Sequence, residues 1–319
     1  MDKHILIMAA EAFWLEEDNW AQTHAKILDK LDQDGCSINP IPPDISVYPE
    51  DFPNQLTREI KLTPLHWAAA YGSLDQVPKD VLTVKNITHQ GKGYTITLGA
   101  RSGVIGQCTW TPLHLAARYG HLTQLPTEAL TVEALTTNTS VGTPLHIAAE
   151  YGHLDQVPKE IFLNTKPPIF NGQNNTLRHN NPILAPDANN STFLHRATWY
   201  SHLDQLPIAF LTSGNMLISG PSGESPLHSA ASHGCLYQLP REVLSGHNLL
   251  IKATRGWTPL QSAIEHDTLD QVLGIDLPEE ARGIVGEEWW KKNQKLLSEI
   301  EQQKSTLSQE TSDSALDIY

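Results

Sequence analysis

A sixteen-residue block occurs six times in this chain of 319 residues, without a gap inside any copy. The third copy reads TPLHIAAEYGHLDQVP. The copies begin at Thr63, Thr111, Thr143, Thr192, Ser225 and Thr258. Successive copies start 48, 32, 49, 33 and 33 residues apart. A period near 33 residues is typical of proteins built from stacked helical units, and the two longer spacings predict two units with insertions.

The residue types within the block predict its local structure. The leading Thr or Ser can cap a helix by accepting a hydrogen bond from a backbone N–H, and Pro follows at the first helical position. The next residue, Leu, is available to a core, and the Ala-Ala pair lets neighbouring helices approach closely. The Gly that follows suits a left-handed helix end. Each block therefore predicts a short, capped helix.

This pattern resembles the ankyrin family, whose signature is T-P-L-H-x-A-A-x-x-G-H-L, over roughly residues 63–273. The resemblance implies an all-α solenoid of six helix-turn-helix units, each with a β-turn finger and two antiparallel helices. The second helix departs from the family because it reads Leu-x-Gln-(Leu/Val)-Pro. Proline costs about 3 kcal/mol inside a helix. We therefore expect a single tight turn and then a short helix with proline at its first position. The prolines concerned are Pro78, Pro126, Pro158, Pro207 and Pro240.

The remaining segments predict caps and insertions around the repeats. Residues 1–60 are expected to form a helical N-terminal cap with a Pro-rich linker, and residues 61–275 the repeats. A capping helix is expected over residues 276–304, with Trp289 and Trp290 covering the end of the stack, and a disordered tail over 305–319. The insertion at about 85–107 has two alternating runs typical of a hairpin. The insertion at about 165–190 is rich in Asn and Pro and predicts an irregular loop.

Two polar residues recur in register and favour structural roles. Glutamines can both donate and accept, so they could bridge backbone groups of adjacent repeats. They are Gln76, Gln124, Gln156, Gln205, Gln238 and Gln271. Histidine occupies the fourth block position in five copies and Gln261 in the sixth. Because an amide replaces the imidazole there, we expect hydrogen bonding between fingers and not metal binding.

Composition and motifs argue against several functional classes. The net charge is -14 and no cluster of Lys and Arg occurs, which disfavours nucleic acid and anionic membranes. No nucleophile elbow, phosphate-binding loop or zinc spacing appears, so we expect no enzyme activity, cofactor or metal. The run Ile5 to Ala10 is too short for a signal peptide. Three separated cysteines fit a reducing compartment, so a cytoplasmic monomer is expected.

The resemblance also implies a binding surface. In ankyrin proteins the contact positions are the finger tip and the two residues before the helix-closing Gly, on the concave face. With the residues flanking them, these positions give the expected partner-binding set Tyr71, Trp110, Arg118, Tyr119, Glu150, Tyr151, Phe193, Trp199, Tyr200, His233 and Trp257. Tyrosine and tryptophan are favoured interface anchors, but the tyrosines could equally pack between neighbouring fingers. Phe193, Trp199 and Tyr200, in the most divergent copy, are the preferred centre.

These observations predict a non-enzymatic scaffold that binds a protein or peptide. A bacterial effector or toxin-associated protein acting on another cell's proteins is the alternative, and it would need a delivery signal. An enzyme hidden in the insertions is a third option, but both insertions are small and lack paired acid and base residues.

Overall fold

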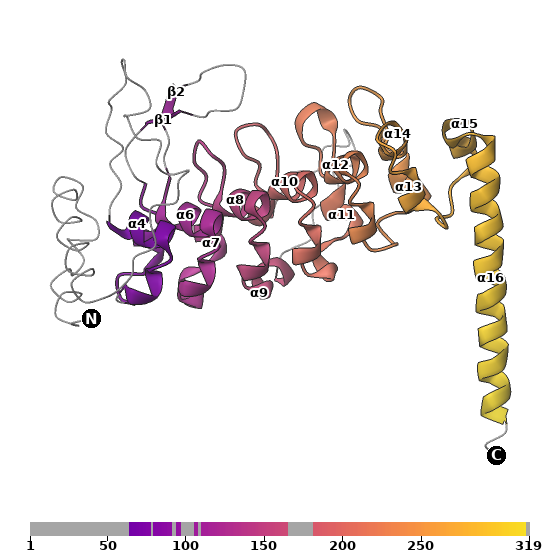
Figure 1. Ribbon diagram of the computed structural model, residues 1–319, viewed down its shortest axis with the longest axis horizontal. Helices are drawn as coiled ribbons and strands as arrows, with labels where there is room; N and C mark the ends of the chain where they lie inside the picture. The colour runs from indigo at the N-terminus through magenta and orange to yellow at the C-terminus, as the bar shows by residue number, and fades with distance from the viewer. Residues whose placement is uncertain are drawn as a thin grey trace. The chain divides into compact units, whose positions relative to one another are not determined.

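The computed structural model (Figure 1) describes residues 64–77, 79–90, 94–96, 105–107, 110–164 and 181–316. The chain forms two compact units. Unit 1 comprises residues 1–166 and 179–197, and unit 2 comprises residues 167–178 and 198–319. The predicted N-terminal cap over 1–60 lies outside the described residues.

Every copy of the block forms a helix. In unit 1 these are α4 (Pro64–Tyr71), α6 (Pro112–Tyr119) and α8 (Pro144–Tyr151), and in unit 2 they are α12 (Pro226–His233) and α14 (Pro259–Glu265). The helix of the fourth copy, α10 (Phe193–Trp199), contains the boundary between the units. The described helices confirm the predicted all-α class.

The predicted helix ends are present. The Thr143 side chain accepts a hydrogen bond from the backbone N–H of His146, and Pro144 follows at the first position of α8. At the other end, Gly152 has φ 75°. A side chain at such a cap would meet its neighbour, because a Cβ added to Gly120 would lie 2.9 Å from the His153 ring. Glycine is therefore required both by the left-handed backbone and by the close approach of the next repeat.

The fourth copy closes its helix without glycine. Ser201 takes the left-handed conformation with φ 60°. The residue that faces it in unit 2 is Cys235, whose thiol interacts with the Ser201 side chain. Cys235 stands where the three preceding repeats have His121, His153 and His202. A smaller neighbour therefore accompanies this serine cap. The sixth copy also closes without glycine, at Asp267, which has φ 57°.

Fingers connect one repeat to the next through tight backbone turns. In unit 1 the Asp187 N–H donates to Ser191 O at 2.8 Å, and Thr139 and Gly142 bond reciprocally. In unit 2 the Gly220 N–H donates to Glu224 O and the Ala253 N–H donates to Trp257 O, both at 2.7 Å. These turns satisfy backbone groups that would otherwise be left without partners.

A one-turn 3-10 helix replaces the long second helix of each repeat, as predicted. The turns at this register are η2 (Leu74–Gln76), η3 (Leu122–Gln124), η5 (Leu154–Gln156), η7 (Leu203–Gln205), η10 (Leu236–Gln238) and η11 (Leu269–Val272). The expectation for the following proline was wrong in register. Pro126, Pro158 and Pro207 have extended ψ values of 128–138° and cap the next segment from outside it. Those segments are η4 (Thr127–Ala129), α9 (Lys159–Leu163) and η8 (Ile208–Phe210).

A set of four-residue helices completes the repeats and was not predicted. They are α5 (Val84–Ile87), α7 (Val132–Leu135), α11 (Ser213–Met216) and α13 (Gly246–Leu249). Each is capped by a Thr or Ser side chain, as Thr83 and Thr212 illustrate. The buried amide of Asn215 donates to Phe210 O at 2.7 Å, and Asn248 donates to Val243 O at 2.9 Å. These bonds join each short helix to the turn before it. Further single turns are η6 (Pro182–Leu184) and η9 (Pro221–Gly223).

The first insertion contains the predicted hairpin. Strand β1 (Tyr94–Ile96) pairs antiparallel with β2 (Ile105–Gln107), so that Tyr94 lies opposite Gln107. The loop that joins them lies outside the described residues, as do residues 165–180 of the second insertion.

The core of each unit lies between the block helices. In unit 1, α4 packs against α6 and α6 against α8, with Leu113, Ala116 and Leu145 completely buried. In unit 2, α12 packs against α14 around Leu227 and Leu260, which are also completely buried. Each such leucine stabilises the fold by roughly 1.5–3 kcal/mol through apolar burial.

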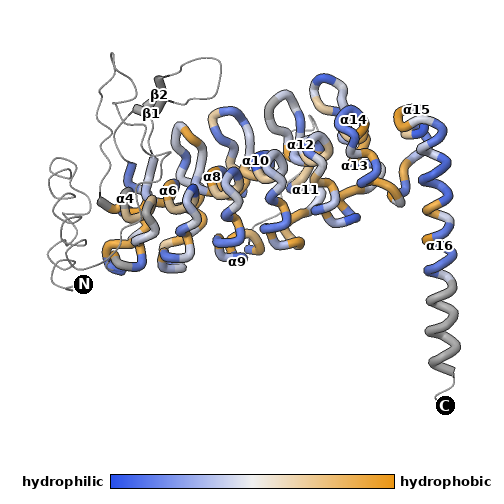
Figure 2. Tube along the Cα trace, in the orientation of Figure 1, coloured by the Kyte–Doolittle hydropathy of each residue, from blue (hydrophilic) through white to orange (hydrophobic). Residues whose placement is uncertain are grey.

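The C-terminal segment of unit 2 comprises η12 (Glu279–Ala281), α15 (Arg282–Val285) and α16 (Glu287–Leu316). Trp290 is buried, and the buried amide of Asn293 accepts from Gly274 N at 2.7 Å and donates to Ile275 O at 3.0 Å. Figure 2 shows the coloured first part of α16 as mainly hydrophilic with isolated hydrophobic positions. The predicted disordered tail from residue 305 was wrong as far as Leu316. No Gly or Pro interrupts α16, so nothing in the sequence ends the helix earlier.

Candidate protein-binding surface

The recurring glutamines clip adjacent repeats together. In unit 1 the Gln124 side chain accepts from Leu74 N and donates to Gly72 O, both at 3.0 Å. In unit 2 the Gln238 side chain accepts from Leu203 N at 3.1 Å and donates to Ser201 O at 2.9 Å. Each amide thereby satisfies two backbone groups of the preceding repeat, which confirms the predicted bridging role.

The recurring histidines connect each helix start to the next finger. In unit 1, His114 Nε2 lies 3.1 Å from Gly142 O, while His114 Nδ1 lies 2.7 Å from the Thr111 hydroxyl. Because a carbonyl oxygen only accepts, Nε2 carries the proton and Nδ1 accepts. Gln261 reproduces part of this pattern in unit 2, since its Oε1 accepts from Thr258 N at 3.0 Å. The predicted hydrogen bonding between fingers is confirmed.

Burial keeps these imidazoles neutral. Loss of hydration lowers the pKa of His66 to about 3 and the pKa values of His114 and His146 to about 4. The pKa of His228 in unit 2 is lowered for the same reason. Within the described ranges, no group of three or more His, Cys, Asp or Glu side chains comes together as a metal site. These histidines are part of the repeat framework.

In unit 1, several residues of the expected binding set contact one another. The Arg118 guanidinium carbon lies 4.9 Å from the ring centroid of Tyr151, 5.5 Å from that of Tyr119 and 5.6 Å from that of Trp110. A cation within about 6 Å of an aromatic centroid is attracted by the ring face. The aromatic rings at these positions of unit 1 therefore already contact a cation of the same chain, Arg118. The side chain of Tyr71 lies outside the described residues.

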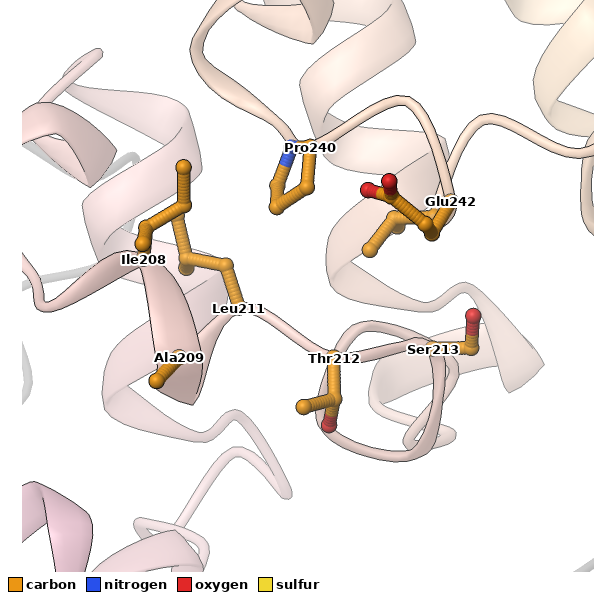
Figure 3. A pocket seen from close by; sticks show the side chains of 8 residues that line it. Ile208, Ala209, Leu211, Thr212, Ser213, Pro240 and Glu242 are labelled. Carbon is orange, nitrogen blue, oxygen red and sulfur yellow. The ribbon is translucent and has the colours of Figure 1, made fainter. Parts of the chain in front are cut away.

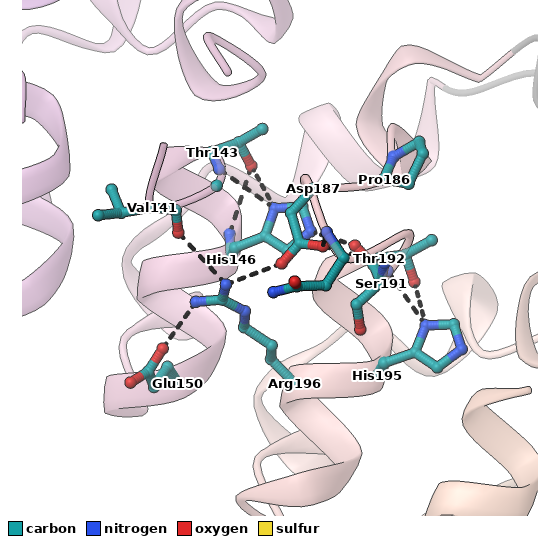
Figure 4. A network of polar contacts seen from close by, with 12 residues as sticks. Val141, Thr143, His146, Glu150, Pro186, Asp187, Ser191, Thr192, His195 and Arg196 are labelled. Atoms are coloured by element: carbon teal, nitrogen blue, oxygen red, sulfur yellow. Dashed lines mark hydrogen bonds and ion pairs between the residues drawn. The ribbon is translucent and has the colours of Figure 1, made fainter. Parts of the chain in front are cut away.

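Glu150 is also engaged inside unit 1, as Figure 4 shows. Arg196 Nη1 donates to the Glu150 carboxylate at 2.7 Å, and Arg196 Nη2 donates to Asp187 at 2.8 Å and to Val141 O at 3.2 Å. Burial alone would raise the pKa of Asp187, but its hydrogen bonds from Arg196 and Ser191 N hold that pKa below its usual value. Arg196 thus joins two fingers to α8 through charged hydrogen bonds.

Phe193 was wrongly assigned to the binding surface. Its side chain is completely buried in unit 1, with its ring centroid 6.1 Å from that of Phe162. The physical reason is its register: Phe193 stands where the other blocks have proline, and Pro112 and Pro144 at that position are buried as well.

The aromatic side chains at the same register in unit 2 are more open to solvent than Tyr151 of unit 1, which is 38% exposed. Trp199 is 61% exposed, Tyr200 45% and Trp257 44%. The Trp199 and His233 ring centroids lie 4.3 Å apart, and His233 Nδ1 donates a hydrogen bond to Ser229 O at 2.8 Å. We call Trp199, Tyr200, His233 and Trp257 the aromatic surface of unit 2. Solvent-exposed tryptophans are uncommon outside interfaces.

A second feature of unit 2 escaped the sequence analysis. An open groove of about 410 Å³ lies beside η8 and α11, and Figure 3 shows its lining side chains. Ile208, Leu211 and Pro240 make its walls apolar, and Glu242 supplies the charged group. The Thr212 hydroxyl in the lining already accepts from Asn215 N as a helix cap. The groove therefore lacks the paired acid and base groups that catalysis requires.

The described cysteine is likewise engaged. Cys235 is completely buried, and burial raises the pKa of its thiol to about 12. Its Sγ lies 3.3 Å from Thr198 O, to which the thiol donates. None of the described helices is long and apolar enough to cross a membrane.

Comparison with known proteins supports the interpretation of the repeats. The family model described as Ankyrin repeat matches residues 109–134. This range contains α6, η3, η4 and the beginning of α7. No curated protein matches the chain. The matched segment shares its threonine cap, its buried leucine and its histidine bond with the third copy of the block. Residues 109–134 are therefore similar to an ankyrin repeat, and the five other copies of the block resemble this segment in sequence.

Proposed function

We propose that this protein is a non-enzymatic scaffold that binds a protein or peptide partner through the aromatic surface of unit 2. Ankyrin repeats generally mediate protein–protein interactions, and the family is typically non-enzymatic. The observation that carries the proposal is the exposure of Trp199, Tyr200 and Trp257 on helix ends and a finger that are held by interrepeat hydrogen bonds.

The chemistry of these side chains supports binding. Each offers a large area of apolar contact, and burying an aromatic ring against a partner gains more than burying smaller side chains. Trp199 is also held in place by the His233 ring, so little side-chain freedom is lost when a partner contacts it. Rigid, exposed aromatic residues are the usual centres of binding energy in protein interfaces.

The contacts within unit 1 reduce the number of residues that we propose for partner binding. Trp110, Tyr119 and Tyr151 surround the chain's own Arg118, and Glu150 is paired with Arg196. We assign these residues to packing within unit 1. Of the expected binding set, the proposal retains Trp199, Tyr200, His233 and Trp257.

Alanine substitution of Trp199 together with Trp257 tests this function. The intact protein and the double variant are used as matched baits, and the captured proteins are quantified by mass spectrometry. We expect a partner whose recovery falls at least about tenfold with the double variant, since losing hot-spot contacts costs 2 kcal/mol or more. The thermal midpoint should change little because neither side chain belongs to the buried core.

Tyr237→Ala is the control, because Tyr237 is 69% exposed but lies in the 3-10 turn η10. Its recovery of the partner should match that of the intact protein. A large fall in the thermal midpoint of the double variant would instead indicate that the aromatic surface serves packing. Equal recovery with all three baits would refute the proposed function.

A further inference from the structure

Repeats two and six hold a tryptophan in the same backbone setting. In unit 1, Trp110 O accepts a hydrogen bond from His66 Nε2 at 3.0 Å, and in unit 2, Trp257 O accepts one from His228 Nε2 at 3.2 Å. Each tryptophan immediately precedes a capping threonine and a helix that begins with Pro-Leu. The backbones of the two tryptophans therefore occupy equivalent positions relative to the helix that follows.

The two repeats differ in the residue that accompanies the indole. Eight residues after Trp110 stands Arg118, whose guanidinium carbon lies 5.6 Å from the Trp110 centroid. Eight residues after Trp257 stands Glu265, the last residue of α14. Repeat six thus retains the ring that attracts a cation but carries a carboxylate in place of the cation.

The replacement leaves both groups of repeat six accessible. Trp257 is 44% exposed and Glu265 is exposed. Among the described residues, Glu265 makes no ion pair, and this includes Lys252 and Arg255 in the preceding finger. An indole face and a carboxylate at the register positions of Trp110 and Arg118 would satisfy the two preferences of a guanidinium. A guanidinium stacks on aromatic rings and donates paired hydrogen bonds to carboxylates.

We propose that Trp257 and Glu265 form a pocket for an arginine side chain of the partner, in the role that Arg118 fills within repeat two. This inference rests on the proposed function and assigns the partner a chemical class: a basic, arginine-bearing segment that docks against unit 2. The net charge of -14 favours the approach of such a segment. Arginine fits better than lysine because its planar group can stack and bind the carboxylate at once.

Isothermal titration calorimetry of the full-length protein with designed peptides tests the inference. The probe is a short Gly-Ser peptide that carries three arginines, and its matched control carries citrulline, which keeps the shape of arginine without its charge. We expect the arginine peptide to bind at least roughly tenfold more tightly than the citrulline peptide, and higher salt to weaken it. A lysine version should bind with intermediate affinity.

Three variants test whether Glu265 is the residue that binds the arginine peptide. Glu265→Gln should weaken the arginine peptide several-fold, while Glu242→Gln, an exposed glutamate of the groove, should leave its affinity unchanged. Glu265→Arg should supply an internal guanidinium to Trp257, as in repeat two, and abolish peptide binding without lowering the thermal midpoint.

Equal binding of the arginine and citrulline peptides, or unchanged affinity in both Glu265 variants, would overturn the inference. The proposed function would survive that result if the variant lacking Trp199 and Trp257 still lost its partner. Loss of both effects would instead remove the aromatic surface as a binding site.

Discussion

Leu145 shows how strongly a single residue of the block contributes to the repeat. Its side chain is completely buried in unit 1, between helices that approach closely through alanine pairs. Leu163 lies in the same unit, but its side chain is 51% exposed at the end of α9. The two leucines therefore have the same chemistry in opposite environments.

Substitution of Leu145 by Ala should lower the free energy of unfolding by about 2–5 kcal/mol, because a cavity remains where the side chain was packed. Leu163→Ala is the matched control and should cost under about 1 kcal/mol. Urea denaturation followed by circular dichroism measures both. A near-neutral effect at Leu145 would contradict its place in the core.

At the scale of the element, the sequence predicted the helix of each block because its signals are local. The Thr cap, the following Pro and the left-handed Gly act within a few residues of one another, as Thr143 and Gly152 show. The 3-10 turn was likewise predicted from the proline that ends it. The proline's own position was missed, since an extended cap and a first helical position require nearly the same φ.

The four-residue helices were missed although their signal is present. Thr83 and Thr212 each precede a buried Asn by three residues, and Ser245 does the same. Helices this short have no apolar periodicity to detect. They persist because their caps and the asparagine amides bond them to the preceding turn.

The glutamine clip can be tested as an element of its own. Gln238→Leu keeps the volume of the side chain but leaves Leu203 N and Ser201 O without their partner. We expect a loss of about 1–3 kcal/mol in the free energy of unfolding, because two largely buried backbone groups lose hydrogen bonds. Gln294→Leu, on the exposed face of α16, should change stability by less than about 0.5 kcal/mol. Equal effects of the two variants would show that the clip is not needed.

Across the whole molecule, buried histidines recur from repeat to repeat, so the effects of their protonation on the free energy of unfolding add together. The pKa of His114 is about 4 in the folded state and near 6.5 in an unfolded chain. The unfolded state therefore binds the proton first as the pH falls. The stability from each neutral imidazole is complete above pH 6.5 and is lost as the pH decreases from 6.5 towards 4.

We expect the free energy of unfolding to fall between pH 7.5 and pH 5, by on the order of 2 kcal/mol for each histidine such as His114. The urea midpoint should fall with it. His114→Gln should reduce this pH dependence, because the amide of Gln261 already serves the same position in repeat six. The lowered pKa of Asp187 adds its own loss only at pH values below 4. A midpoint that is constant over this range would contradict neutral, buried histidines.

The binding surface could be predicted only in part, because exposure depends on contacts made across the chain. Register predicted Trp199 and Trp257 as surface residues, and both side chains are exposed. It could not separate them from Trp110, which is covered by Arg118, or from Phe193, which occupies a core position. The pairing of Glu150 with Arg196 joins residues 46 apart, and no local pattern announces it.

The Ser201 and Cys235 pair means that these repeats are not interchangeable modules. The Ser201 cap is accommodated by the small Cys235 side chain one repeat later, whereas the Gly72 and Gly120 caps lie against the imidazoles of His121 and His153. Shuffling or duplicating repeats to build longer arrays would separate residues that fit only each other. A segment moved into another repeat protein should therefore span the junction between two repeats and include the half of each repeat that faces it.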